Sequence, residues 1–315
     1  MIAKDLNDMG KPRRTFKGSG FARFSDGTRV KAWFTLVQLI DTQLMFITDI
    51  KRPIWDWVAA SIELTSFHGT LQDGRPVSVQ GFFIIENKQA PQGKTRLIGY
   101  SSNWIIGEPN INEATSIFFE LVNFRFLGTE NEVFIEGSTQ RSTLSLMTLK
   151  LGEREIKLRW EPDYDRVVAA LRAQHGVQVT CTATATIENS ADIDLAIAMM
   201  ETLCDIMTVA RGTLVSWTSF DVKAGGSRPP LYSRYRDSVT RPFVGIELIN
   251  SADREHTKSF LERGFLRCQE IAPDFQVKKI ARVFSDTRGG SFIESRSLLI
   301  GVLVEYLASV RSRLE

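Results

Sequence analysis

The sequence predicts an α+β fold, with a strand-rich first part and a helical last part. Short apolar or β-branched runs, separated by turn sequences such as Asp73-Gly74, fill most of residues 15–160. After residue 253, apolar residues recur every three or four positions, which is the spacing of amphipathic helices. Strands and helices do not alternate in the first part, so we do not expect a parallel, doubly wound sheet.

The strands of the first part are predicted mostly as hairpins around turn residues. Their paired strands cover residues 20–24 with 28–38, 62–70 with 77–85, and 143–150 with 155–160. Further strands are expected over residues 42–48, 95–100, 116–126 and 132–136. Many short strands at this spacing indicate a sandwich or barrel, and we expect a sandwich-like domain.

The next stretch carries the clearest periodicity of the chain. Residues 177–187 alternate strictly between apolar and polar side chains, as a half-buried strand does. Residues 188–222 follow as a long apolar helix and a strand, with Ser190 as the expected N-cap and Gly212 as the stop. Asp192 and Asp194 suit the positive end of the helix dipole. A helix that is apolar around most of its girth is expected to be buried.

The predicted domain boundary lies at the linker-like residues 224–230, with the sequence AGGSRPP. The prediction is a strand-rich domain over residues 1–223, containing the long buried helix, and a mainly helical domain over residues 224–315. Helices are expected over residues 253–271 and 274–285 and from Ser291, where Ser291 and Glu294 form a capping box. Because this last helix still runs at Glu315, we expect a further C-terminal region.

Composition indicates a globular, cytoplasmic chain. Hydrophobic residues make up 43% and charged residues 24%, and the net charge of +2 favours neither nucleic acid nor a membrane surface. Cys181, Cys204 and Cys268 are too widely spaced for a zinc site or a disulfide framework. No signal peptide and no apolar run of about 20 residues is visible, so we expect no membrane association. No cofactor is predicted.

Catalytic signatures are weak in this sequence. His68, His175 and His256 fall in different predicted elements, and no G-x-S-x-G is present, so no nucleophile beside a base is predicted. Glu155-Ile156-Lys157 has the E-x-K spacing of metal-dependent nucleases, with Glu136 as the candidate earlier acid. Such a tripeptide is common by chance, so we favour surface charges on a hairpin.

A basic stretch is the candidate nucleic-acid interface. Residues 227–288 hold twelve Lys and Arg against eight Asp and Glu. Aromatic and basic residues that interleave can stack on bases and neutralise phosphates. The candidate residues are Arg228, Arg234, Tyr235, Arg236 and Arg241. A solvated helical face explains the same excess of positive charge, and we favour it.

Two further stretches have binding chemistry. Arg288, Gly289, Gly290 and Ser291 precede a predicted helix, where backbone amides can hold an anion. A glycine turn with a cap is the interpretation that we favour for them. Trp55 and Trp57 offer a ligand platform at the edge of a β-sandwich, although aromatic residues there more often belong to a core edge or a domain contact.

The strand-rich first part is followed by ETLCDIMTVARGTLVSWTSFD and later by FIESRSLLIGVLVEYLASV. This succession resembles the large N-terminal domain of ApeA-like proteins, bacterial anti-phage factors that join such a domain to a C-terminal HEPN domain. The likeness covers most of the chain, from about Thr15 on, and rests on pattern. The family's HEPN part resembles an RNA-cutting enzyme and carries an Arg and a His separated by four to six residues. This chain has no such pair, so no catalytic residue is carried over.

The resemblance implies a non-catalytic sensor or interaction module of a bacterial anti-phage defence protein. Its expected partner is a phage protein or nucleic acid, and the oligomeric state stays open, a homo-oligomer included. A metal-dependent nuclease or other hydrolase using Glu155 and Lys157 is the first alternative. A carbohydrate-binding β-sandwich using Trp55 and Trp57 is the second.

Overall fold

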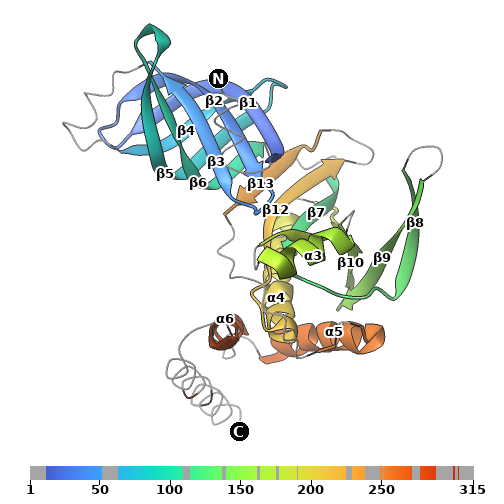
Figure 1. Cartoon of the computed structure of the whole chain (residues 1–315). Helices are drawn as coiled ribbons and strands as arrows, with labels where there is room; N and C mark the ends of the chain where they lie inside the picture. The colour runs from blue at the N-terminus through green and yellow to red at the C-terminus, as the bar shows by residue number, and fades with distance from the viewer. Residues whose placement is uncertain are drawn as a thin grey trace. The chain divides into compact units, whose positions relative to one another are not determined.

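A computed structural model describes residues 12–51, 63–108, 114–136, 140–161, 164–174, 177–189, 191–224, 229–237, 249–250, 252–271 and 277–288, together with Gly301 and Val304. The predicted α+β class is confirmed, since antiparallel strands dominate and the helices lie in the second half of the chain (Figure 1). Of the helix predicted from Ser291, only Gly301 and Val304 are among the described residues, and both are helical.

The chain forms two compact units. Unit 1 consists of Met1–Ala114 and Thr218–Ser238, and unit 2 of Thr115–Trp217 and Val239–Glu315. The chain therefore enters unit 2, returns to unit 1 inside strand β12 (Ser216–Ala224), and leaves it again. The boundary predicted at residues 223 and 224 does not coincide with this division. A linker-like composition does not show that the strand before it pairs within unit 1.

Unit 1 is built mainly from its first six strands. They are β1 (Pro12–Phe24), β2 (Arg29–Leu39), β3 (Leu44–Ile50), β4 (Leu64–Leu71), β5 (Pro76–Ala90) and β6 (Lys94–Gly107). The strands pair in the order β3-β2-β1-β4-β5-β6, and β3 also pairs with β6, so the sheet closes on itself. The sandwich-like arrangement expected from the sequence is therefore a single closed sheet in this unit.

The inside of the closed sheet is filled with apolar side chains. Phe34, Phe46, Phe67 and Trp104 are at most 5% exposed and belong to one cluster. The indole Nε1 of Trp104 donates a hydrogen bond of 2.5 Å to Ser101 Oγ, which satisfies its polar atom. A void of about 10 Å³ lies among Phe34, Phe46 and Phe67, and it is too small to hold a ligand.

Strand β13 (Tyr232–Arg236) is an element that the sequence analysis did not assign. It pairs antiparallel with the second half of β6, where Tyr235 lies opposite Trp104. On its other side it pairs with β12. Its alternation buries Ser233 and Tyr235, which are polar residue types, so the usual apolar signal of a strand is missing.

Unit 2 contains a second antiparallel set of strands. They are β7 (Ala114–Val122), β8 (Glu130–Glu136), β9 (Gln140–Leu151), β10 (Arg154–Trp160) and β11 (Val179–Thr186). Their pairing order is β7-β11-β10-β9-β8. Strands β9 and β10 form the hairpin that the sequence predicted, and β11 is the predicted alternating strand.

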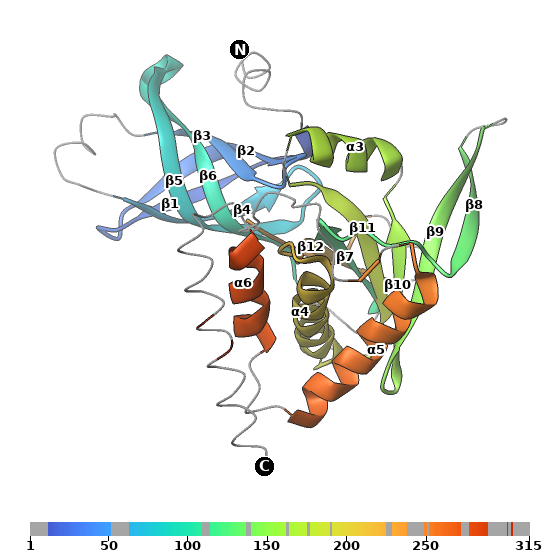
Figure 2. The same ribbon diagram turned by 60° about the horizontal axis from the view of Figure 1, so that its bottom comes forward.

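The helices of unit 2 whose bounds the structure gives are α3 (Tyr164–Gln174), α4 (Ala191–Arg211), α5 (Arg254–Ile271) and α6 (Val277–Arg288). The burial predicted for the long helix is confirmed, since Met200, Leu203, Cys204 and Met207 are at most 4% exposed. Helix α4 contacts both α5 and α6, and α5 also contacts β9 (Figure 2). Helices α5 and α6 therefore pack against α4 and belong to the same compact unit.

Candidate functional site

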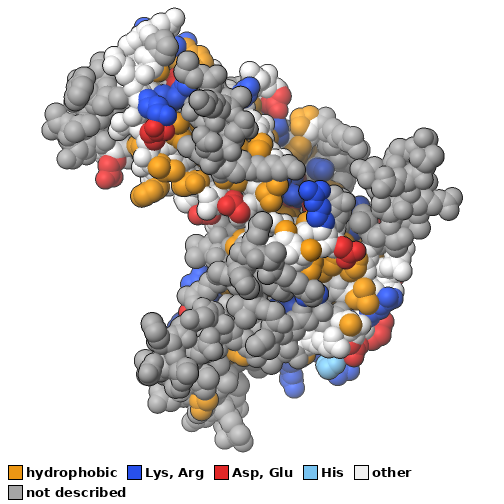
Figure 3. Space-filling view, viewed as in Figure 1, with side chains coloured by type: hydrophobic (Ala, Val, Ile, Leu, Met, Phe, Trp, Pro, Cys, Tyr) orange, Lys and Arg blue, Asp and Glu red, His pale blue; other side chains and the backbone are white. Residues whose placement is uncertain are grey.

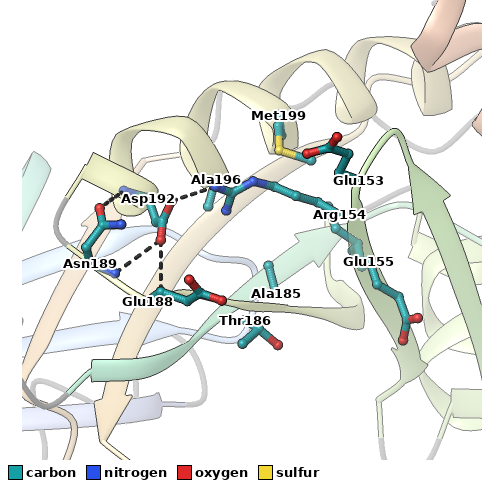
Figure 4. Close-up of a pocket in the computed structure, with 11 residues that line it drawn as sticks. Glu153, Arg154, Glu155, Ala185, Thr186, Glu188, Asn189, Asp192, Ala196 and Met199 are labelled. Atoms are coloured by element: carbon teal, nitrogen blue, oxygen red, sulfur yellow. Dashed lines mark hydrogen bonds and ion pairs between the residues drawn. The ribbon is translucent and has the colours of Figure 1, made fainter.

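A pocket in unit 2 lies between the β9–β10 hairpin, the end of β11 and the start of α4. Its volume is about 420 Å³, within the range of small-ligand sites. The polar side chains that line it are Glu153, Arg154, Glu155, Thr186, Glu188, Asn189 and Asp192 (Figure 4). Ile156, Ala185, Ala196 and Met199 supply its apolar walls.

The β9–β10 turn places the first wall of the pocket. Leu151 pairs with Arg154, so Gly152 and Glu153 form a two-residue hairpin loop. Gly152 has a φ of 68°, and Glu153 is not among the positive-φ residues, which fits a type II′ turn with glycine in first position. The turn therefore holds Glu153 and Arg154 at the end of the hairpin.

The start of α4 places the opposite wall. Asp192 Oδ2 accepts hydrogen bonds from the backbone N–H groups of Glu188, at 2.8 Å, and Asn189, at 3.1 Å. Asn189 Oδ1 in turn accepts from the N–H of Asp192 at 3.3 Å. These reciprocal bonds satisfy amides at the helix start, as a capping box does. The predicted N-cap, Ser190, lies outside the described residues.

An ion pair spans the pocket between these two walls. Arg154 Nη2 lies 2.5 Å from Asp192 Oδ1, and Figure 4 shows the arginine reaching across from β10 to α4. The Asp192 side chain is 10% exposed. The hydrogen bond from Arg154, followed by the one from the Glu188 amide, lowers the pKa of Asp192 below its usual value. Asp192 is therefore a carboxylate at neutral pH.

The pocket carries an excess of negative charge. Glu153, Glu155 and Glu188 line it in addition to the Arg154–Asp192 pair, so four carboxyl groups face one guanidinium. Glu155 points away from the ion pair (Figure 4), and its Oε1 lies 3.7 Å from Lys157 Nζ. Glu153 and Glu188 are thus the two acidic residues that we consider as possible contacts for a ligand in the pocket.

The metal-nuclease hypothesis required Glu136 near Glu155, and the register separates them. Glu136 pairs with Gln140 and Glu155 pairs with Lys150, ten positions further along β9. Ten residues of strand span about 33 Å, so the backbone places these two positions too far apart to share one cation. Among the residues that the structure describes, no group of three or more Asp, Glu, His or Cys side chains is placed to hold a metal ion.

The predicted aromatic–basic interface is corrected at Tyr235. This residue is 1% exposed, inside the cluster of Trp104, and its Oη accepts a hydrogen bond of 2.7 Å from Arg14 Nη1. A buried ring has no free face for a base. Arg234 and Arg236 point to the other side of β13, and Arg234 Nε donates to Asn103 Oδ1 at 3.2 Å. Arg228 and Arg241 lie outside the described residues.

The remaining predicted sites do not join the pocket. His68 is exposed on β4 of unit 1, and His256 is exposed in the first turn of α5, 3.9 Å from Asp253. Trp55, Trp57, His175, Gly289, Gly290 and Ser291 lie outside the described residues, and of Arg288 only the backbone is described, as the last residue of α6. Burial, and then neighbouring Cys204, raises the pKa of the Cys181 thiol well above its usual value, which makes it a poor nucleophile.

No protein-family model, no curated protein and no solved structure matches this chain. Of the helices that the structure describes, none has the length and apolar character needed to cross a membrane. The site therefore has to be interpreted from its own chemistry.

Sequence reasoning missed the pocket, although it noted parts of it. The hairpin turn before Arg154 and the position of Asp192 at a helix start were both predicted. Their contact joins residues 38 positions apart, which no local pattern reveals. The available signal was an arginine directly after a tight turn and an aspartate that the sequence places at the start of a buried helix.

Proposed function

We propose that this chain is the non-catalytic, ligand-recognising part of a bacterial anti-phage defence protein, and that its pocket binds a cationic group. The defence role rests on the resemblance to ApeA-like proteins. The observation that supports the pocket as the binding site is the Arg154–Asp192 ion pair. Arg154 is the only basic residue that lines the described pocket, and its charge is paired with Asp192, whereas Glu153 and Glu188 line the same pocket.

Charge decides which ligand suits the pocket. Four carboxyl groups against one guanidinium leave a formal charge of −3 when all are ionised. A phosphate-bearing ligand is repelled by such a lining, whereas a Lys or Arg side chain of a phage protein gains charge-assisted hydrogen bonds. The volume of about 420 Å³ accommodates one such side chain with part of its backbone.

The same geometry favours binding over acid–base catalysis by Asp192. Because its pKa is lowered, Asp192 is ionised throughout the neutral range and is a poor proton donor there. Its two oxygens already accept three hydrogen bonds, from Arg154, Glu188 and Asn189. Asp192 therefore holds the two walls of the pocket together, and Glu153 and Glu188 are the residues that bind a cationic ligand.

The binding experiment uses calorimetry with the peptides Gly-Arg-Gly and Gly-Lys-Gly, and Gly-Gln-Gly as the uncharged probe. We expect the cationic peptides to bind and the Glu153→Gln/Glu188→Gln variant to bind them at least about tenfold more weakly, since each lost charged contact removes about 1.5–3 kcal/mol. Glu255→Gln on α5, an exposed change outside the pocket, is the matched control. Equal binding of Gly-Gln-Gly, or no loss in the double variant, contradicts a cation pocket.

Two further measurements test the remaining parts of the proposal. Plaque counts on bacteria that express the protein should rise when Glu153→Gln/Glu188→Gln is introduced, if the pocket serves defence. Incubation of the purified chain with RNA and DNA in the presence of Mg²⁺ or Mn²⁺ should leave both intact. Cleavage that disappears in Glu155→Ala would establish the nuclease alternative instead.

A further inference from the structure

The outer face of the closed sheet in unit 1 brings aromatic and basic side chains together. Phe21 lies opposite Lys31, and Arg23 lies opposite Arg29, on the paired strands β1 and β2. Side chains at alternate positions of a strand share a face, so Trp33 lies on the same face as Lys31. We call this set the aromatic–basic surface, and it consists of Phe21, Arg23, Arg29, Lys31, Trp33 and Lys94.

The two rings of this surface are open to solvent and are flanked by cations. Phe21 is 47% exposed and Trp33 is 38% exposed, which is unusual for large apolar side chains on a strand. The Arg29 guanidinium lies 5.0 Å from the Phe21 ring centre. Lys94 Nζ lies 4.3 Å and Lys31 Nζ 5.4 Å from the Trp33 ring centre. Phe21 and Trp33 are diagonal neighbours across β1 and β2, about 7–8 Å apart.

The positive charge of this surface is concentrated in few residues. Four of its six residues are cations, although the whole chain has a net charge of only +2. Asp49, which pairs with Trp33 across β2 and β3, is already bound by Arg96 through two hydrogen bonds of 2.7 and 2.9 Å. In Figure 3, basic and acidic side chains lie beside hydrophobic ones over unit 1, at the upper left of that view.

We propose that the aromatic–basic surface binds single-stranded nucleic acid. Bases stack on Phe21 and Trp33, and the flexible Arg23, Arg29, Lys31 and Lys94 side chains move to the phosphates. Stacking requires unpaired bases, because a duplex keeps its base faces inside, and a sheet surface does not fit a groove. An acidic polypeptide would satisfy the cations and leave the rings without a function. The surface lies in unit 1 and shares no residue with the acidic pocket of unit 2.

The test is fluorescence anisotropy of labelled oligo-dT and oligo-U with the full chain, from 20 to 200 mM salt. Trp33→Ala should weaken binding about 5- to 150-fold, which corresponds to the loss of one stacked base. Lys31→Gln/Lys94→Gln should lower the slope of log affinity against log salt by about 1.4, since each phosphate contact to a single strand contributes about 0.7. Phe83→Ala, a 70% exposed ring outside the surface, and Lys157→Gln in unit 2 should leave both quantities unchanged.

Each outcome supports or overturns the proposal. Binding of oligo-dT, oligo-U or both, with loss in Trp33→Ala, supports it and shows whether the 2′-hydroxyl matters. No binding at 20 mM salt, a preference for duplex, or an unaffected Trp33→Ala overturns it. Displacement of the probe by poly-glutamate as efficiently as by unlabelled oligo-dT overturns it in favour of an acidic protein partner. Glu153→Gln/Glu188→Gln, which should weaken peptide binding in the pocket, should leave the binding of oligo-dT and oligo-U unchanged. The two proposals can therefore fail separately.

Discussion

The two units bury different kinds of polar group. Among the described residues, the buried charged side chains are Glu120, Asp192 and Arg211, and all three belong to unit 2. The described part of unit 1 buries only uncharged polar side chains, such as Gln38, Thr48 and Ser101. Unit 1 thus depends on apolar packing inside a closed sheet, while unit 2 depends in addition on charges that must stay paired.

The position of two of these charges explains how unit 2 tolerates them. Asp192 lies in the first turn of α4 and Arg211 is its last residue, so each sits at the end of the helix dipole that favours its sign. Arg211 Nη1 donates a hydrogen bond of 3.1 Å to the carbonyl of Ile249, and its guanidinium lies 5.1 Å from the Phe124 ring centre. The dipole of α4 therefore favours the negative charge of Asp192 at one end and the positive charge of Arg211 at the other.

Trp104→Ala should have the largest effect on the apolar side of this comparison. Trp104 is 0% exposed and packs against the rings of Phe16 and Tyr235, at 6.4 and 5.7 Å between ring centres. Its removal should lower the free energy of unfolding by about 3–5 kcal/mol through lost transfer energy and a cavity. Urea unfolding followed by circular dichroism measures this. Phe83→Ala, at an exposed position, should stay within about 0.5 kcal/mol, and equal losses would contradict a packed closed sheet.

Arg211→Met should have the next largest effect and tests the charged side of the comparison. Arg211 is 1% exposed, and methionine keeps much of its apolar length but not its donors. We expect the free energy of unfolding to fall by about 2–3 kcal/mol, because the carbonyl of Ile249 loses this hydrogen bond. Arg267→Met on α5, with a side chain 76% exposed, is the matched control. A variant more stable than the wild type would show that this buried charge is a cost to unit 2.

The strands and helices were predictable where the signal is local. Turn residues such as Asp73-Gly74 fixed the hairpins, and the 3.6-residue period fixed α4 and α5. Closure of the sheet was not predictable, because it pairs residues 45–50 with residues 95–100 across half of unit 1. The same limit applies to β13, whose sequence YSRYR has no apolar period of its own.

Sites were harder to predict than elements, since a residue type does not reveal its partners. Tyr235 was selected because it stands between two arginines, yet its opposite neighbour on β6 is Trp104, which draws it into the core. For Phe21 and Trp33, the sequence alone predicts no more than their places in strands. Only the register of β1 against β2 shows that these rings share one outer face with Arg29 and Lys31. The Arg154–Asp192 pair was hidden for the same reason.

The stability of the two units should depend differently on pH. The pKa of Asp192 is lowered in the folded state, so its stabilising contribution is full above the ordinary pKa of about 3.9 and is lost as the pH falls through the lowered value. Asp192→Asn should therefore reduce stability at pH 7, and the stability of this variant should decrease less steeply than that of the wild type as the pH falls. In unit 1, Arg75 lowers the pKa of the more exposed Asp73, and Asp73→Asn should change the pH dependence less. Thermal unfolding between pH 7 and pH 2 measures both, and identical curves would contradict the difference.

Gly152→Ala and Gly27→Ala should have the smallest effects and nearly equal ones. Both glycines occupy hairpin turns with positive φ, 68° in unit 2 and 83° in unit 1, and a Cβ at either site meets no atom within 4 Å. The cost is then only that of placing an L-residue in the left-handed region, about 1–2 kcal/mol in each unit. Urea unfolding of both variants tests this. Gly152→Ala should also weaken binding of Gly-Arg-Gly, because the turn positions Glu153 and Arg154, whereas Gly27→Ala should not. If both variants bind the peptide as the wild type does, the hairpin turn does not shape the pocket.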